Sequence, residues 1–563
     1  MRIRLTSLRQ KRDRDLRLSG RAAALCAALA AALVAGAPSC AGGSDTEVPA
    51  TSSTQGAGGV GGGSGGAGGA SACMPGETAP CYSGPEGTKD VGTCVAGTQT
   101  CAEDGSAFGA CEGEIVPATD SCMTFDDEDC DGLLAACPGE ASWALSAGDS
   151  TDQRLNSVAV DSKGDIVITG AFAGTITLGE TALTSAGGFD IFVAKLDPGG
   201  KVIWAQSFGD QFDESGNGVA IDSSGNVAIT GDFKGTVNLG GEVLASAGSE
   251  DIFVAMLDQA GKHLWSKRFG DIAYQSGRSI AADSSGNVAV LCTVEGSTSF
   301  GGSSLATAGG ADVALAKLNP GGNHLYSKIF GGPSADSASE IVIDSKSNIT
   351  ITGSFSGAAT FGGASLVSAG GFDVFLGRFN DAGIHLWSKA FGDAADQTGR
   401  SVDVDFMGNI VLTGAFLGTI DFGGGPLQSQ GGEDVFVAKL DDMGLGIWSK
   451  AFGDPAQQIG RAIVTDAAGN IVLTGSLSGS ADFGGGPITS AGLSDVFLAK
   501  WSPTGEHLLS KAFGDAADQS GRTLEVDSAG VLIGGQFQGA LDLGNITITS
   551  SGSNDLYITR IAP

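Results

Sequence analysis

A 61-residue period fills residues 143–563 and constrains the fold of this chain more than any other feature. Seven copies of nearly equal length begin at residues 143, 204, 265, 326, 387, 448 and 509. Six of the copies share the marker Phe-Gly-Asp, or Phe-Gly-Gly in one of them, at Phe208, Phe269, Phe330, Phe391, Phe452 and Phe513. Such a period indicates a repeat architecture, in which each copy is one small unit that buries its apolar surface against its neighbours.

Each copy reads as four short β-strands. In the copy that begins at Trp204, the strands are predicted at 204–208, 219–222, 227–230 and 251–257. Gly225 supplies the positive φ that a tight turn between the second and third strands needs. Residues such as 166–168 are apolar in succession, so both faces of each sheet must be covered. Sheets stacked around an axis meet that condition, which predicts an all-β, seven-bladed β-propeller over residues 143–563.

The two ends of the repeat region predict how the ring closes. The last copy stops at 555–563, after its fourth strand, and lacks the Trp-led strand that every other copy takes from its successor. Residues 143–148 carry that strand at the other end of the region. We therefore expect one closing blade built from both ends of the repeat.

These copies resemble a known family. The run Val-Ala-Ile-Asp-Ser-Ser-Gly-Asn at 219–226, followed by Asp-Ile-Phe-Val-Ala at 251–255, resembles the SBBP repeats, the seven-bladed β-propeller repeats of bacterial surface proteins. The resemblance covers residues 143–563 and implies the fold and an extracytoplasmic setting, but no known reaction. The segment 73–137 resembles the Cys-rich modules of myxobacterial surface lipoproteins.

The N-terminal residues predict export. Residues 1–39 pass from an Arg-rich stretch through an apolar run to small residues, the pattern of a signal peptide. The apolar run is about 13 residues long, whereas a membrane-spanning helix needs roughly 20. Cys40 resembles the lipidated cysteine of bacterial lipoproteins, which implies an outer-membrane or cell-surface lipoprotein. Pro38 departs from that pattern, and the alternative is cleavage after Ala37 with free secretion. The Gly, Ser and Ala residues of 40–72 predict a disordered tether.

A Cys-rich module is predicted over residues 73–137. Its eight cysteines, in an exported chain, predict four disulfides of unspecified connectivity: Cys73, Cys81, Cys94, Cys101, Cys111, Cys122, Cys130 and Cys137. Three acids spaced by two and followed by glycine, Asp127, Asp129 and Asp131, resemble the start of a calcium loop. The acid expected eleven residues after Asp127 is replaced by Pro138, so a solvated acidic turn is the alternative. Calcium is the one cofactor that the sequence indicates.

Several chemically capable residues occupy one register in many copies. These are the histidines (His263, His324, His385, His507), the tryptophans (Trp143, Trp204, Trp265, Trp387, Trp448), and the aspartates that open the last strand (Asp190 to Asp495, and Asp555). Residues repeated around a ring have structural roles, whereas an active site converges from unlike positions. We therefore predict no catalytic residue, tryptophans that form the core between blades and not a sugar-stacking ring, and a buried, unreactive Cys292. A basic residue recurs at the position of Lys195 in the first copy, and we expect it to pair with carboxylates. Rim loops such as 392–400 are a further place where the sequence allows calcium.

Charge narrows the classes of function. The 63 acidic residues against 31 basic ones give a net charge of -32, which disfavours nucleic acid and anionic membrane surfaces as partners. We expect a monomeric, non-enzymatic surface or secreted protein that binds a protein or glycan through its rim loops and contacts a membrane only through a lipid on Cys40. The alternative is a propeller hydrolase or lyase acting on extracellular polysaccharide, which would need unlike carboxylates or a cofactor pocket near the axis.

Overall fold

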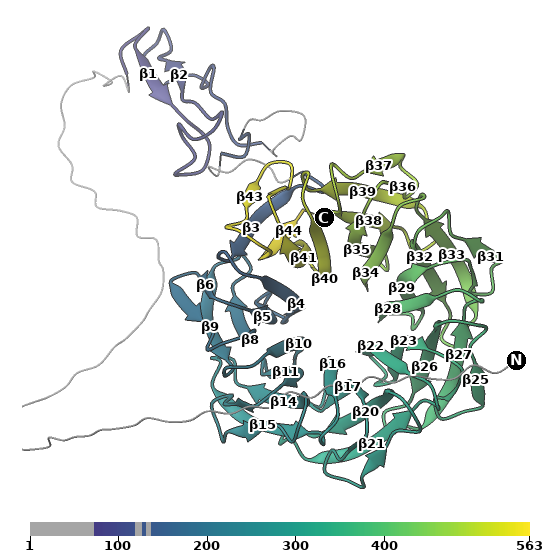
Figure 1. The fold of residues 1–563 in the computed structure, drawn as a ribbon. Helices are drawn as coiled ribbons and strands as arrows, with labels where there is room; N and C mark the ends of the chain where they lie inside the picture. The colour runs from purple at the N-terminus through teal and green to yellow at the C-terminus, as the bar shows by residue number, and fades with distance from the viewer. Residues whose placement is uncertain (1–72, 119–126, 131–136, 563) are drawn as a thin grey trace, which may run out of the picture. The chain divides into compact units, whose positions relative to one another are not determined.

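Residues 141–561 form a closed ring of four-stranded antiparallel sheets in the computed structural model, which describes residues 73–118, 127–130 and 137–562 (Figure 1). Seven such sheets surround one axis, confirming the predicted seven-bladed β-propeller. No helix within the described ranges has the length and apolarity needed to cross a membrane.

Blade 1 shows the common plan. From the axis outward its strands are β4 (Gln153–Val160), β5 (Ile166–Phe172), β8 (Asp190–Leu196) and β9 (Val202–Phe208). The Trp-led strand is thus the outermost strand of its sheet.

Blades 2 to 6 repeat this order. Blade 2 consists of β10 (Glu214–Ile221), β11 (Val227–Phe233), β14 (Asp251–Leu257) and β15 (His263–Phe269). Blade 3 consists of β16 (Gln275–Ala282), β17 (Val288–Val294), β20 (Asp312–Leu318) and β21 (His324–Phe330). Blades 4 to 6 consist of β22 (Asp336–Ile343), β23 (Ile349–Phe355), β26 (Asp373–Phe379), β27 (His385–Phe391); β28 (Gln397–Val404), β29 (Ile410–Phe416), β32 (Asp434–Leu440), β33 (Gly446–Phe452); and β34 (Gln458–Thr465), β35 (Ile471–Leu477), β38 (Asp495–Trp501), β39 (His507–Phe513).

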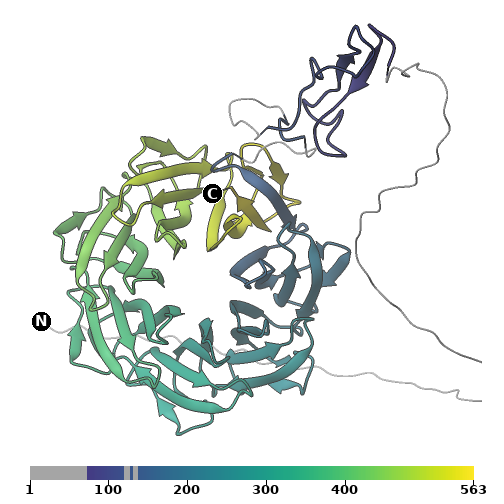
Figure 2. The ribbon, with the colours of Figure 1, turned by 180° about the vertical axis from the view of Figure 1, so that it is seen from behind.

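Blade 7 closes the ring with strands from both ends of the repeat region, as predicted. It consists of β40 (Gln519–Asp527), β41 (Gly530–Phe537), β44 (Asp555–Ile561) and, outermost, β3 (Ala141–Ala147). The blue β3 lies among yellow strands in both views (Figures 1 and 2). β3 pairs antiparallel with β44, Trp143 opposite Arg560, and the Thr559 hydroxyl donates a hydrogen bond to the Trp143 carbonyl at 2.8 Å.

Each blade also carries a small two-stranded hairpin that the four-strand prediction missed. These hairpins follow the second strand of each sheet and are β6 (Thr175–Leu178) with β7 (Thr181–Thr184), β12 (Thr236–Val237) with β13 (Leu244–Ala245), β18 (Ser297–Thr298) with β19 (Leu305–Ala306), β24 (Ala358–Thr360) with β25 (Ser365–Val367), β30 (Thr419–Asp421) with β31 (Pro426–Gln428), β36 (Ser480–Asp482) with β37 (Pro487–Thr489), and β42 (Ala540–Asp542) with β43 (Thr547–Thr549). Strands of two to four residues are too short to show a hydrophobic period.

The core lies between the blades. Every residue of β5 and of β8 is buried, which explains why these strands are apolar in succession. The turn between the second and third predicted strands contains Gly225 at φ +80°, as expected. Cys292 is fully buried in β17 among Val290, Val294 and Ala314, and burial raises the pKa of its thiol well above the usual range. It is a small core residue, as predicted.

Buried ion pairs tie the inner hairpin of a blade to its third strand. Lys195 bonds to Asp161 (3.3 Å) and Asp165 (2.9 Å), and the same slot forms an ion pair in five other blades. The other pairs are Lys317 with Asp283, Arg378 with Asp344, Lys439 with Asp405, Lys500 with Asp466 and Arg560 with Asp527. The predicted carboxylate pairing is therefore confirmed, and Met256 is the exception in the remaining blade.

Substituting Lys317 by methionine, the residue that blade 2 uses in this slot, is expected to destabilise the ring. Lys317 is 1% exposed and bonds to Asp283 at 2.8 Å and to Asp381, so the variant would leave buried charge unpaired. Removing one partner of a buried pair costs about 3–5 kcal/mol. Thermal unfolding followed by circular dichroism measures the effect, with exposed Lys346→Met as the control. Equal melting temperatures for the two variants would contradict this account.

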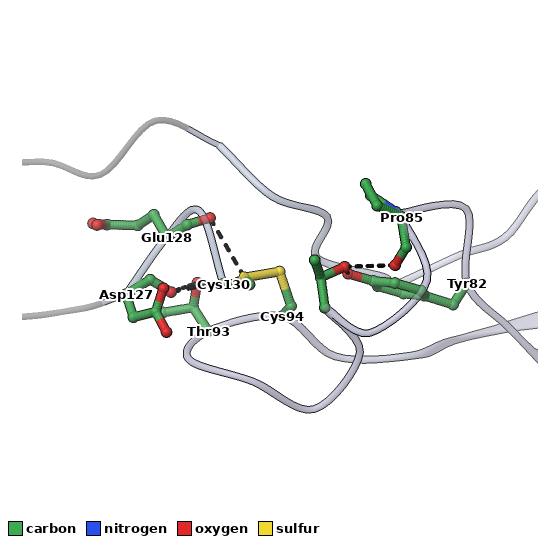
Figure 3. The surroundings of a disulfide bond; sticks show 8 residues. Tyr82, Pro85, Thr93, Cys94, Asp127, Glu128 and Cys130 are labelled. Atoms are coloured by element: carbon green, nitrogen blue, oxygen red, sulfur yellow. Dashed lines mark hydrogen bonds between the residues drawn. A yellow bond between two sulfur atoms is a disulfide. The ribbon is translucent and has the colours of Figure 1, made fainter. Parts of the chain in front are cut away.

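The Cys-rich module has little regular structure among its described residues. Its strands are β1 (Thr78–Cys81) and β2 (Gly97–Thr100), and its disulfides include Cys73 to Cys101, Cys81 to Cys111 and Cys94 to Cys130. Cys137 is disulfide-bonded as well. Figure 3 shows the Cys94–Cys130 bond beside Thr93 and Asp127. Cross-links of this kind stabilise a segment with so small a core.

Candidate functional site

The residues singled out for calcium are only partly described. Asp127 is buried beside the Cys94–Cys130 disulfide, and its carbonyl accepts hydrogen bonds from the Thr93 backbone N–H (2.9 Å) and hydroxyl (3.2 Å) (Figure 3). Asp129 is also described, whereas Asp131, Cys122 and the lipidation candidate Cys40 lie outside the described residues. Among the residues that are described, no cluster of three or more His, Cys, Asp or Glu side chains could hold a metal ion. Calcium at Asp127, Asp129 and Asp131 stays a prediction.

The carboxylates of the rim loops act as hydrogen-bonded caps. In blade 5, Asp393 Oδ1 accepts from the Ala395 N–H (2.9 Å) and from Gln397 Nε2 (2.8 Å), while Oδ2 accepts from the Thr419 N–H (2.7 Å). These bonds lower the pKa of Asp393, the Ala395 N–H having the largest effect. Three N–H donors directed at one carboxylate leave it little capacity to bind a cation, which argues against calcium in this loop.

Blade 2 departs from this cap in a way that makes stability depend on pH. Glu214 stands where five other blades have glutamine, such as Gln397, whose Nε2 donates to Asp393 Oδ1 and to the Leu417 carbonyl. Glu214 is 1% exposed, its Oε1 is buried without a hydrogen-bond partner in the described chain, and burial raises its pKa to about 8.

Glu214→Gln is expected to stabilise the protein at pH 8 by about 1–3 kcal/mol, because it replaces an unsatisfied acid by an amide with two acceptors in reach. The ordinary pKa of a glutamate is 4.5, and that of Glu214 in the folded protein is about 8. At a pH between these two values the folded protein retains a proton that the unfolded chain releases, so stability falls as the pH rises. The variant should therefore lose less stability between pH 5 and pH 8.5, measured by calorimetry. Exposed Glu242→Gln is the control, and parallel pH profiles for both variants and the parent would exclude this role.

The repeated histidines and tryptophans have structural positions. His263 Nε2 shares a 3.0 Å hydrogen bond with the Ser266 hydroxyl, and the other three histidines make the same bond with the serine three residues later. The indole N–H of Trp204 donates to the Gln259 carbonyl in the next blade at 3.1 Å, and Trp143, Trp265, Trp387 and Trp448 make the same contact. The predicted contact between blades is thus present, but the predicted burial of these rings in the core is wrong, because they lie half-buried on the outermost strand.

A different column of residues lines the axis. Each innermost strand has a β-bulge at the same register, between Gly399 and Ser401 in blade 5, and the skipped residue lines the axial cavity. These seven residues are Asn156, Asn217, Arg278, Ser339, Arg400, Arg461 and Arg522. Bulges re-aim side chains, and here they direct all seven to one end of the cavity, which we name the arginine mouth.

The four guanidiniums of the arginine mouth have no carboxylate in direct contact among the described residues, although the charge of Glu433 acts on Arg400 and Arg461. None of them takes part in an ion pair within the described part of the chain. Arg461 Nε donates to the Ser476 hydroxyl (3.0 Å), and Arg522 Nη1 lies 3.4 Å from Gln536 Oε1. Burial, together with the charges of Arg522 and Arg400, lowers the pKa of Arg461 to about 9. An anion at this position would relieve both the desolvation and the mutual repulsion.

Three carboxylates, those of Glu340, Asp403 and Glu525, lie farther along the same axial cavity, which has a volume of about 350 Å³. Asp403 and Glu525 follow Arg400 and Arg522 by three residues, or about 10 Å of strand. Burial raises the pKa of Glu525 to about 8 and that of Glu340 to about 7.

Two of these acids connect neighbouring blades. Glu340 accepts from the Val402 N–H at 2.9 Å, and Asp403 accepts from the Thr465 N–H at 2.7 Å and its hydroxyl at 2.8 Å. Their side chains therefore have a structural use, whereas Glu525 is half-buried in the cavity wall.

The arginine mouth was missed because the net charge of the chain is negative and because strand alternation does not reveal the orientation of a bulge residue. One signal was present. The column from Asn156 to Arg522 changes identity from copy to copy, in contrast to the uniform columns of His, Trp and Asp. A position that varies within a regular repeat is free to serve a ligand.

Comparisons with known proteins do not show a family for this chain. No family model matches the chain. A curated relative, an uncharacterized WD repeat-containing protein of Acanthamoeba polyphaga mimivirus, is 24% identical over 154 residues, and the match spans 24% of this chain and 11% of the relative.

Solved structures similar to this chain include the Neurospora crassa Pan2 WD40 domain (11% identity, TM-score 0.37, 72% of this chain and 89% of that one). They also include YCF48 bound to D1 peptide, with 9% identity and a TM-score of 0.36 over 74% of this chain and 96% of that one. A PL25 ulvan lyase bound to a glucuronate–rhamnose sulfate unit has 13% identity and a TM-score of 0.42 over 74% of this chain and 96% of that one. The seven sheets of the structure itself show a β-propeller repeat protein, and its site has to be interpreted from its own residues.

Proposed function

We propose that this protein is a non-enzymatic binding protein that holds an anionic ligand in the arginine mouth. The observation that carries the proposal is the convergence of four arginines, from four blades, on one end of an axial cavity without an ion-pair partner among the described residues. Guanidiniums bind carboxylates, sulfates and phosphates through charge-assisted hydrogen bonds. Because the arginines lie on the axis of the ring, we place the ligand at the mouth of the axial cavity and not at the rim loops.

The setting we propose is the cell surface or the extracellular space. The signal pattern of residues 1–39 and the disulfides of the Cys-rich module support export, because such bonds persist in oxidising compartments. Lipidation of Cys40 would tether the propeller to a membrane. The seven registered copies support membership of the SBBP family, and the Cys-rich module supports a lipoprotein of the myxobacterial kind.

A hydrolase or lyase acting on extracellular polysaccharide is the second candidate. The observation that favours it is the group of three carboxylates beneath the arginine mouth, since acid and base catalysis needs carboxyl groups with differing pKa values. The blade contacts of Glu340 and Asp403 explain two of these acids without catalysis, so binding is the better supported function.

Calorimetric titration of residues 40–563 with dextran sulfate and with uncharged dextran tests this proposal. We expect binding of dextran sulfate that weakens as NaCl rises from 20 to 300 mM, because the contact is between charges, and no binding of dextran. Equal behaviour of the two polymers would overturn the proposal. Release of reducing ends from polygalacturonate by the parent, but not by Glu525→Gln, would favour the enzyme.

A further inference from the structure

A second cavity opens beside the arginine mouth, between blades 6 and 7. It has a volume of about 340 Å³, at the lower end of the range of small-molecule sites, and shares Arg461 with the axial cavity. Its lining is almost entirely hydroxyl and amide side chains, contributed by Gln457, Ser476, Ser478, Ser494, Gln519, Ser520, Gln536, Gln538 and Asn554, with Ile459 and Asp518. A ligand that fills it must offer many hydrogen-bonding groups and little apolar surface.

Two slots that contribute to this lining vary between blades. The slot of Gln538 and Ser478 holds Ala173 in blade 1 and Leu417 in blade 5. The slot of Ser494 and Asn554 holds phenylalanine in blades 1 and 4, as Phe189 and Phe372. Other blades carry charged residues in these slots, such as Lys234 and Glu250 in blade 2. Blades 6 and 7 differ from the other five in having uncharged polar residues in both slots, at the face that also carries the arginine mouth.

Several of these polar groups are open to a ligand, while others orient the arginines. The side chains of Ser478, Ser494 and Gln538 are half-buried and make no hydrogen bond within the described part of the chain. Ser476 accepts from Arg461 Nε at 3.0 Å and shares a 2.9 Å hydrogen bond with Ser520. The cavity and the guanidinium of Arg461 therefore form one continuous polar surface.

We propose that this cavity binds a sugar ring of an acidic saccharide whose carboxylate or sulfate group is held by Arg461 and Arg522. This inference rests on the proposed anion binding and specifies its ligand class. A sugar ring fits the chemistry because its hydroxyls can both donate to and accept from serine hydroxyls and glutamine amides, which a bare inorganic anion cannot do. An apolar peptide side chain would make poorer use of this lining, which is mostly polar and offers many hydrogen-bonding groups.

Calorimetric titrations of residues 40–563 test the inference with four probes: tetragalacturonate, a chondroitin sulfate tetrasaccharide, uncharged maltotetraose and inorganic sulfate. The informative variant is Ser494→Phe, which fills the cavity with the residue that blades 1 and 4 use in that slot. Ala311→Phe makes the same change in the equivalent slot of blade 3 and is the control. Melting temperatures of both variants verify that the ring is intact.

We expect at least one acidic tetrasaccharide to bind at least 10-fold more tightly than inorganic sulfate, and the better of the two identifies the anionic group. Ser494→Phe should lower that affinity at least 10-fold and leave sulfate binding unchanged, whereas Ala311→Phe should alter neither. If the acidic saccharides bind but Ser494→Phe has no effect, the sugar site is overturned while anion binding stands. If neither inorganic sulfate nor any acidic saccharide binds, both proposals fall.

Discussion

Replacing Arg400, Arg461 and Arg522 together by asparagine is expected to lower affinity for dextran sulfate by at least about 100-fold, since each hydrogen bond to a charged group contributes about 1.5–3 kcal/mol. Asparagine is suitable because blades 1 and 2 carry it at the same bulge, as Asn156 and Asn217. The same variant should unfold at an equal or higher temperature than the parent, because mutual repulsion and desolvation of the guanidiniums are removed. A gain in stability with loss of binding is typical of residues kept for function.

The control for this experiment changes the net charge by the same amount at the surface. Lys201, Lys262 and Lys346 are exposed, and their replacement by asparagine also removes three positive charges. We expect this triple variant to bind dextran sulfate within about 3-fold of the parent at 150 mM NaCl, because exposed charges are screened over about 8–10 Å. Equal losses in the two triple variants would mean that binding follows overall charge and not the arginine mouth.

Deleting residues 143–148 is expected to lower the melting temperature by on the order of 10 °C and to make the transition less cooperative. The deletion removes most of β3, hence the outer strand of blade 7 and its ladder with β44. It also removes Trp143, whose indole donates to the Pro198 carbonyl in blade 1 at 3.2 Å. Losing a ladder of about six hydrogen bonds, at roughly 1 kcal/mol each, accounts for a change of this size.

A deletion of equal length in the predicted tether, residues 61–66, is the control for the loss of β3. It should leave the melting temperature within about 1 °C of the parent, because a segment without apolar bulk contributes no packing to the ring. An unchanged, cooperative transition after deletion of residues 143–148 would contradict a ring that is closed by β3.

The fold was largely predictable because the repeat makes each local signal appear seven times. The 61-residue spacing, the apolar runs of β5 and β8, and the unpaired ends of the repeat were enough to predict the number of blades and the strand that closes the ring. The outer hairpins escaped prediction because strands such as β12 have two residues and depend on the rest of the blade for their conformation.

The candidate site was predictable only in part, for two physical reasons. Uniform columns such as the histidines were interpreted as structural, and each histidine contacts the same serine in its own blade. The arginine mouth depends on a bulge that redirects Arg400 and its equivalents, and a bulge breaks the two-residue alternation on which strand orientation is inferred. Net charge, summed over the whole chain, also concealed a local group of like charges.

The most direct test of the central claim is to locate an anion in a crystal of residues 40–563 soaked in selenate, using the anomalous scattering of selenium. The account predicts a strong selenium peak on the axis of the ring, within hydrogen-bond distance of Arg461 and Arg522. The peak should be absent from crystals of the variant with asparagine at positions 400, 461 and 522. Selenate bound only at surface lysines, with none in the arginine mouth, would contradict it.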